Sequence, residues 1–242
     1  MFFGLFKEKS IKRKKMQWLT ECLFCGNYVY RLKDNRVKCS HCHKKISLQK
    51  INKIIFLIES FINNENALYV SKRMKMAYSS VYAYYEEFRL LCAKKTESEY
   101  ELLREKNCEY EEYFYLEKSK KNNLKAIFDA KNFLTFDYEG HIYTLLMPSL
   151  QQYKQQFMQD NIQDPYLAEF NKFKRISRII KVSKHYNNIV RFWEYFEHEI
   201  VKYKGIKSES FIYFLKECEF KFNHEKFKAI ELLTQEYFKG KL

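Results

Sequence analysis

The spacing of apolar residues changes along the chain and predicts helices first. From position 51 onward, isoleucine and phenylalanine recur at the three- and four-residue intervals of a single helix face: Ile51, Ile54, Ile55, Ile58, Phe61 and Ile62. After a polar break at 63–66, a short helix is expected around Ala67, Val70 and Met74. A third helix is expected from about Ser79 to Cys92, with four side chains facing inward: Val81, Tyr85, Phe88 and Cys92.

An alternation of period two in the middle of the chain predicts strands. Three segments show it, with a turn at 138–140 between the last two: Glu109–Leu116, Lys125–Phe136 and His141–Met147. Residues 149–159 and most of 165–236 return to a helical pattern. Strands followed by helices indicate an α+β or mixed α/β fold.

Four cysteines add the first chemical signal. They form two Cys-x-x-Cys pairs with thirteen residues between them: Cys22 with Cys25, and Cys39 with Cys42. Each pair brings two thiolates round a tight turn, and two facing pairs can enclose a tetrahedral Zn²⁺. The segment between them predicts a β-hairpin with its turn at Asp34–Asn35. We therefore expect a zinc ribbon whose structural Zn²⁺ supplies folding free energy that so small a core cannot.

Other uses of these cysteines fit the sequence less well. Disulfides need an oxidising compartment, and the start of the chain, apolar at 1–6 and basic at 7–15, lacks a signal-peptide cleavage pattern. A redox pair would need only one Cys-x-x-Cys. His41 and His43 lie inside and beside the second pair, so replacement of one thiolate by a histidine stays open.

Positive charge is concentrated in the same part of the chain. The formal net charge is +14, and residues 1–50 carry thirteen Lys and Arg against three acids. Such a region favours binding to a polyanion, because binding releases counterions. A solvated basic tail or a generally lysine-rich composition would give the same excess of positive charge. The candidate nucleic-acid contacts here are Lys12, Arg13, Lys14, Lys15, Arg36, Lys38, Lys44 and Lys45. No apolar run approaches membrane-spanning length, so we expect a cytoplasmic protein without a membrane partner.

The three helices predicted over 51–95 match a helix-turn-helix, in which the third helix enters the major groove of double-stranded DNA. The first residues of that helix would face base edges, and nearby basic residues would face phosphates. The candidate contacts are Lys72, Arg73, Ser79, Ser80, Tyr82 and Arg89. Any compact three-helix unit has the same periodicity, so that alternative stays open.

Three later segments carry a resemblance to a known family: His141–Pro148, His185–Trp193 and Gly205–Asn223. They are similar, in order, to the third strand, the His-x-Asn-x-Ile-Glu-x-Phe-Trp helix and the closing motif of small bacterial insertion-sequence transposases with a ribonuclease-H-like DDE domain. With the ribbon and the helix-turn-helix, the resemblance spans about residues 19–225. It implies four domains: a basic arm at 1–18, a zinc ribbon at 19–50, a helix-turn-helix at 51–95, and a ribonuclease-H-like transposase domain at 96–242, with a three-strand meander and C-terminal helices.

The resemblance also implies a catalytic site. Such enzymes hold two Mg²⁺ ions with three carboxylates and carry out DNA strand transfer. Glu111 stands at the first aspartate position, and only Asp160 and Asp164 are available for the second. Val190 stands at the third position, where it cannot ligate a metal. The implied catalytic residues are therefore Glu111 and Asp164, with Mg²⁺ as cofactor if the protein is active, in a site that is impaired.

These features leave three functions open. The first is a transposase-like protein that binds insertion-sequence ends, as a homo-oligomer by analogy with proteins that pair two ends. The second is a non-enzymatic, zinc-dependent DNA-binding regulator or remnant. The third is a module stabilised by zinc that binds RNA or a protein partner. Competition between duplex DNA and RNA would distinguish it, because the major groove of A-form RNA does not admit a recognition helix.

Overall fold

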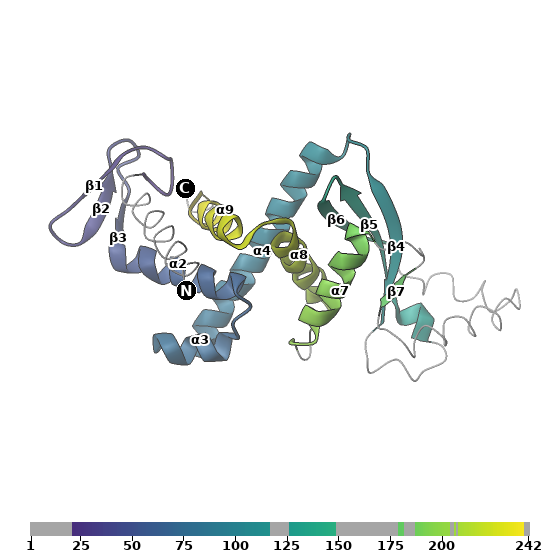
Figure 1. The fold of residues 1–242 in the computed structure, drawn as a ribbon. Coiled ribbons are helices and arrows are strands. Elements are labelled where there is room, and N and C mark those ends of the chain that lie inside the picture. The colour runs from purple at the N-terminus through teal and green to yellow at the C-terminus, as the bar shows by residue number, and fades with distance from the viewer. Residues whose placement is uncertain are drawn as a thin grey trace, which may run out of the picture. The chain divides into compact units, whose positions relative to one another are not determined.

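The computed structural model describes residues 21–116, 126–148, 179–181, 187–203, 206 and 208–239. Within these ranges the chain forms two compact units (Figure 1). The first unit comprises residues up to Leu91 together with those from Glu225 onward, and the second comprises Cys92–His224. The mixed α and β content agrees with the expected fold class, whereas the four domain boundaries and the ribonuclease-H-like arrangement stay predictions.

The first unit begins with a three-stranded antiparallel sheet in the order β1-β2-β3. Its strands are β1 (Val29–Arg31), β2 (Arg36–Cys39) and β3 (Lys45–Ser47). Asn35 adopts a left-handed φ of 59° in the turn between β1 and β2, a conformation that asparagine tolerates well. The hairpin predicted around Asp34–Asn35 is therefore confirmed, and β3 adds a strand that the sequence did not indicate.

Four helices complete the first unit: α2 (Leu48–Ile62), α3 (Ala67–Met74), the N-terminal part of α4 (Tyr78–Leu103) and α9 (Lys226–Lys239). The side chain of Ser47 caps α2 by accepting a hydrogen bond from the Lys50 amide. The predicted apolar stripe of α2 is confirmed, since all six of its residues are 8% exposed or less. α9 packs against α2, and the Phe61 ring meets Tyr85 and Phe88 of α4 edge-on.

α4 is longer than the predicted third helix and continues to Leu103. Its first residues follow a short turn in which Lys75 is left-handed, with a φ of 54°. The four residues expected to face inward are buried: Val81, Tyr85, Phe88 and Cys92. The charged segment beyond residue 92 extends the helix because Glu, Lys and Ala are good helix formers.

The second unit contains a four-stranded sheet in the order β6-β5-β4-β7 (Figure 1), with every neighbouring pair antiparallel. Its strands are β4 (Glu109–Tyr115), β5 (Lys131–Tyr138), β6 (His141–Leu146) and β7 (Ile179–Lys181). The three-strand meander β4-β5-β6 agrees with the prediction, including the turn at Glu139–Gly140.

Two predictions about this sheet are wrong. The strand expected from Lys125 begins at Lys131, because the short 3₁₀ helix η2 (Ala126–Asp129) occupies the preceding residues and buries Phe128. Residues 179–181, expected within a helical region, form β7 by pairing with Tyr113–Tyr115 of β4. Both errors concern short segments, and in β7 the pairing with β4 overrides local propensity.

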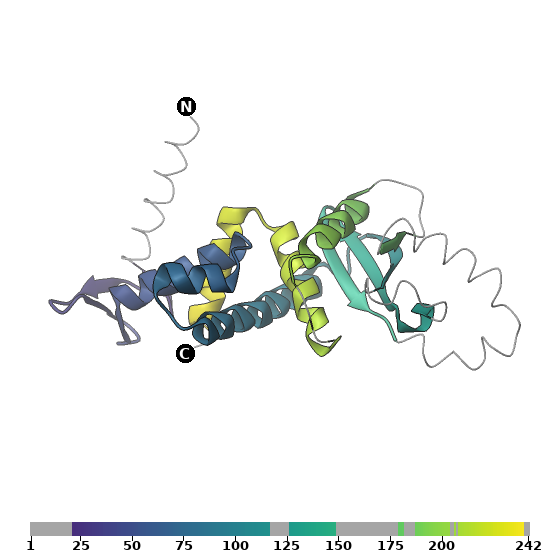
Figure 2. The same ribbon diagram turned by 90° about the horizontal axis from the view of Figure 1, so that it is seen from below.

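Helices α7 (Asn188–Ile200) and α8 (Phe211–Asn223) pack on one face of the sheet (Figure 2). The 3₁₀ helix η4 (Ser208–Ser210) precedes α8. The Trp193 ring stacks on Tyr113 at 5.0 Å, and its Nε1 donates a 3.0 Å hydrogen bond to Thr135 Oγ1. Phe192, Trp193 and Phe196 are buried in this core. None of the helices that the structure describes combines the length and apolar character needed to span a lipid bilayer.

Candidate metal centre and nucleic-acid surfaces

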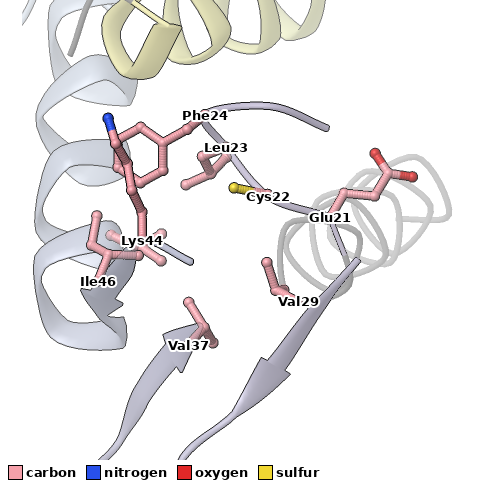
Figure 3. Close-up of a pocket in the computed structure, with 9 residues that line it drawn as sticks. Glu21, Cys22, Leu23, Phe24, Val29, Val37, Lys44 and Ile46 are labelled. Carbon is pink, nitrogen blue, oxygen red and sulfur yellow. The ribbon is translucent and has the colours of Figure 1, made fainter. Parts of the chain in front are cut away.

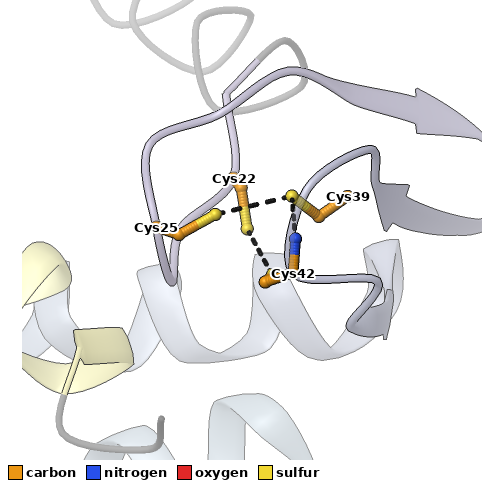
Figure 4. A group of neighbouring side chains, drawn as sticks. All are labelled: Cys22, Cys25, Cys39 and Cys42. Carbon is orange, nitrogen blue, oxygen red and sulfur yellow. Dashed lines mark hydrogen bonds between the residues drawn. The ribbon is translucent and has the colours of Figure 1, made fainter.

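The four predicted ligand cysteines lie together at one end of the ribbon (Figure 4). Their Sγ atoms all lie within 4.8 Å of one another, with Cys22 to Cys42 at 3.7 Å and Cys25 to Cys39 at 3.5 Å. A tetrahedral Zn²⁺ with Zn–S bonds of about 2.3 Å separates its sulfur ligands by about 3.8 Å. The thiols are therefore spaced to hold zinc, and four protein ligands leave no open coordination position.

Hydrogen bonds to sulfur favour the thiolate form in part of this cluster. The amide and side chain of Asn27 lower the pKa of Cys25 to about 5. Burial raises the pKa of the Cys39 thiol, but the amides of Cys42 and His41 outweigh it and leave that pKa below its ordinary value. Burial raises the pKa of Cys22 to about 12. Metal binding would therefore release protons and weaken in acid.

Neither nearby histidine joins the cluster. His41 and His43 are both exposed, and His43 sits in a left-handed turn with a φ of 58°. Among the residues that the structure describes, the group of potential metal ligands around this point consists of the four cysteines alone. The geometry thus favours a four-thiolate site over one in which a histidine replaces a cysteine.

A small apolar pocket lies beside the cysteines, between the ribbon strands and α2 (Figure 3). Leu23, Val29, Val37 and Ile46 contribute to its walls. It has room for no more than about one water molecule. We assign no ligand to it, because its walls belong to the packing between the ribbon and α2.

The basic residues of the ribbon differ in their contacts and in their solvent exposure. Arg36 donates to Asp34 from Nε at 2.7 Å, so its charge is partly neutralised. The Lys44 ammonium lies 4.7 Å from the centre of the Phe24 ring (Figure 3). Lys38 is half-buried and Lys45 is exposed on the sheet. The basic arm, with Lys12, Arg13, Lys14 and Lys15, lies outside the described residues.

The candidate contacts of the three-helix region divide into two groups. Lys72, Ser79 and Ser80 are exposed, and Tyr82 is 38% exposed. These residues lie at the end of α3 and the start of α4, as a helix-turn-helix contact surface requires.

The two arginines of this region make contacts within the protein, and only Arg73 is exposed. Arg73 forms a 2.6 Å ion pair with Glu65, donates to Ser60 Oγ at 2.9 Å and lies over the Phe56 ring. Arg89 is only 5% exposed, so it cannot reach a duplex in this structure and we withdraw it as a contact. The apolar neighbours on its helix face carry it into the core.

The implied catalytic carboxylate, Glu111, lies in the second unit and is hydrogen-bonded there. Glu111 of β4 accepts hydrogen bonds from Asn187 Nδ2 at 2.9 Å and from the Tyr113 hydroxyl at 3.1 Å. Burial, together with the charge of Glu111, raises the pKa of Tyr113, so this hydroxyl stays a donor. Asp160 and Asp164 lie outside the described residues. Among the residues that the structure describes, no three carboxylates lie together, around Glu111 or at any other point.

Two asparagines, neither of them a predicted site residue, hold the side chains of Cys25 and Glu111 in place. Asn27 follows the first cysteine pair and bonds Cys25 Sγ at 3.5 Å. Asn187 caps α7 by accepting from the Val190 amide at 3.1 Å, and it holds Glu111 at the same time. An asparagine directly before an amphipathic helix is a recognisable N-cap signal, but its bond to a distant strand is not visible in sequence.

One curated relative is similar to part of the chain. Over 78 residues the chain is 30% identical to a protein of Haemophilus influenzae named an uncharacterized transposase-like protein. The match covers 31% of this chain and 63% of that relative, so the chain spans less than two thirds of the relative's length. No protein-family model and no solved structure matches the chain.

Proposed function

We propose that the chain is a transposase-like protein that binds double-stranded DNA at insertion-sequence ends. The observation that carries this proposal is the four-cysteine cluster at the head of a cationic ribbon. The cysteines Cys22, Cys25, Cys39 and Cys42 would hold a Zn²⁺ whose role is structural, because all four coordination positions are taken by protein. The name of the Haemophilus influenzae relative supports the transposase-like assignment.

The proposed duplex contacts lie on the three-helix region that follows the ribbon. Ser79, Ser80 and Tyr82 at the start of α4 would face base edges, and Lys72 at the end of α3 would face a phosphate. Residues 51–95 then act as the helix-turn-helix, behind the ribbon at 19–50 and the arm at 1–18. The region from residue 96 would be the ribonuclease-H-like domain, and two protomers would pair two DNA ends.

Binding rather than strand transfer is the activity that we propose. Val190 occupies the implied third ligand position, and Glu111 is already bonded to Asn187 and Tyr113. We therefore propose that the catalytic site is impaired. This favours a DNA-binding regulator or remnant of a transposase over an active enzyme.

The test measures binding of the full-length protein to labelled duplexes taken from the DNA that flanks its reading frame. We expect the logarithm of affinity to fall linearly with the logarithm of salt concentration, by about 0.9 per phosphate contact. A zinc chelator should abolish binding, and Lys72→Ala should reduce the salt slope by about 1. Lys94→Ala is the control, because this exposed lysine lies about 21 Å further along α4 than Ser80.

Four results would contradict the proposal. Absence of duplex binding at moderate salt would remove the DNA-binding function, and chelator-resistant binding would remove the role of zinc. Cleavage of an element end with Mg²⁺ or Mn²⁺ would show that the catalytic site is intact. Tighter binding to double-stranded RNA than to the duplex would favour an RNA-binding module, since an A-form major groove excludes a helix.

A further inference from the structure

The outer face of the ribbon sheet carries exposed tyrosines beside lysines. We propose that this face binds single-stranded DNA, with unpaired bases stacked on Tyr28 and Tyr30. The inference rests on the proposed function only in taking DNA as the substrate. It adds a second contact surface, separate from the helix-turn-helix residues, and a different form of DNA.

Successive side chains of a strand point to opposite faces of the sheet, which fixes the direction of the two tyrosines. Val29 and Val37 are 5% and 4% exposed and point into the ribbon core. Tyr28 and Tyr30, on either side of Val29, are 64% and 39% exposed. Both rings therefore stand on the face opposite the core.

The register across the sheet places positive charge next to these rings. Tyr30 pairs with Lys38 of β2, and Lys38 pairs with Lys45 of β3, which gives one row across the three strands. Paired residues on neighbouring strands project to the same side of a sheet. A base on Tyr30 would thus leave its phosphate within reach of lysine ammonium groups.

The acidic residues near this face do not cancel its charge. Residues 21–47 contain six Lys and Arg and two acids, Glu21 and Asp34. Asp34 is bonded to Arg36. Glu21, the β-bridge partner of Tyr28, places one carboxylate at the edge of the sheet beside that ring, away from Lys38 and Lys45. The centre of the outer face, where Lys38 and Lys45 lie, is therefore cationic.

The spacing of the two tyrosines favours unpaired over paired bases. Residues two apart on a strand are separated by about 7 Å, roughly twice the 3.4 Å between successive stacked bases of a duplex. Two rings at that spacing can each stack on a base of an extended single strand, but bases inside a duplex expose no free faces between them. Aromatic platforms beside basic residues are the usual means of binding single strands without sequence preference.

The backbone under Tyr28 is fixed, which lowers the entropic cost of stacking. Its carbonyl oxygen accepts from the Ser40 amide at 3.0 Å and from Ser40 Oγ at 2.9 Å. Cys39, directly before Ser40, belongs to the four-cysteine cluster. The presentation of Tyr28 should therefore depend on metal binding by the four cysteines.

The experiment measures the affinity of the full-length, zinc-loaded protein for a labelled oligothymidylate by fluorescence anisotropy. Tyr28→Ala and Tyr30→Ala should each weaken binding between about 5-fold and 150-fold, the range for loss of one aromatic stack. Tyr28→Phe should retain binding because the ring, not the hydroxyl, makes the contact. Lys45→Ala should reduce the salt slope by about 0.7, the value for single strands.

The control is Tyr110→Ala, which removes a tyrosine of the second unit that is 66% exposed. It should leave oligothymidylate binding unchanged, and zinc content verifies the fold of every ribbon variant. Unchanged single-strand affinity in the Tyr28→Ala, Tyr30→Ala double variant would overturn the inference. Tighter, tyrosine-dependent binding to oligouridylate would assign the face to RNA instead.

A duplex measured in parallel separates this inference from the proposed function. If duplex binding persists in the double variant and single-strand binding is lost, both proposals hold. If the unmodified protein binds no duplex, the proposed function fails, whereas tyrosine-dependent single-strand binding would still support the ribbon surface. Equal losses for duplex and single strand would overturn the preference for unpaired bases.

Discussion

Removal of the buried lysine at position 216 should strongly destabilise the second unit. Lys216 Nζ donates to the Thr144 carbonyl at 2.8 Å and to both carboxylate oxygens of Glu219 at 3.0 Å. Glu219 Oε2 also accepts from the Thr144 amide and hydroxyl, at 2.9 and 2.6 Å. The two side chains are 8% and 0% exposed. The pair thus joins α8 to β6 inside the core.

The magnitude follows from the number of bonds and their burial. All three ammonium protons of Lys216 are used, and Lys216→Met leaves the Glu219 charge buried with Thr144 as its remaining partner. Breaking a buried pair in this way costs about 3–5 kcal/mol of unfolding free energy. In Lys216→Met combined with Glu219→Leu no charge remains, and the unpaired groups of Thr144 cost about 1–3 kcal/mol. The double variant should therefore be more stable than Lys216→Met alone.

The assay is urea unfolding, followed by circular dichroism and tryptophan fluorescence, for a complete double-mutant cycle. Lys228→Met is the control, since Lys228 is 56% exposed and its 3.7 Å pair with Glu231 should contribute at most about 1 kcal/mol. Burial raises the pKa of Glu219, and loss of Lys216 raises it further. The penalty in Lys216→Met should therefore shrink as pH falls. A loss below about 1 kcal/mol, or additive single effects, would refute this account.

Three further predictions concern the metal, the cap of α7 and acid stability. The purified protein should contain one Zn²⁺ per chain by elemental analysis, Cys39→Ser should remove it, and Cys108→Ser, at an exposed cysteine outside the cluster, should not. Asn187→Ala should lower the free energy of unfolding by about 0.5–2 kcal/mol in urea titrations, because α7 loses its N-cap. Burial lowers the pKa of His141 in the folded protein. As pH falls below about 6.5, the unfolded chain therefore takes up a proton at this residue before the folded protein does, and the free energy of unfolding should decrease. His141→Asn should flatten that part of the curve of thermal midpoint against pH, and an unchanged slope would contradict the assignment.

The parts of the fold that were predictable depend on local signals. The turn at Asp34–Asn35 and the six-residue stripe of α2 each follow from residues close in sequence, and both are confirmed. The four-cysteine cluster was predictable for the same reason, because ligand spacing fixes which residues can meet.

The parts that were not predictable depend on partners distant in sequence. β7 exists because residues 179–181 pair with Tyr113–Tyr115, and three residues carry no periodicity that could reveal it. Arg73 and Arg89 were both proposed as DNA contacts from their charge, but Arg89 is buried, whereas Arg73 stays exposed while it bonds Glu65 and Ser60. Residue type indicates what a side chain can bind, whereas its packing decides whether it is accessible.

The same distinction bears on Glu111, where the implied catalytic role and the observed structural role make opposite predictions. As a link between β4 and α7, its carboxylate needs only an oxygen that accepts from Asn187 Nδ2. Glu111→Gln keeps such an oxygen and should be nearly as stable as the unmodified protein, whereas Glu111→Ala leaves the donor unsatisfied and should cost about 1 kcal/mol or more. A metal ligand would behave differently, because an amide lacks the charge that Mg²⁺ requires and both variants would lose divalent-ion binding equally. Measured by urea unfolding and by calorimetric titration with Mn²⁺, a stable Glu111→Gln and no ion binding in any form would establish Glu111 as a structural residue. Ion binding that both substitutions abolish would restore its catalytic assignment.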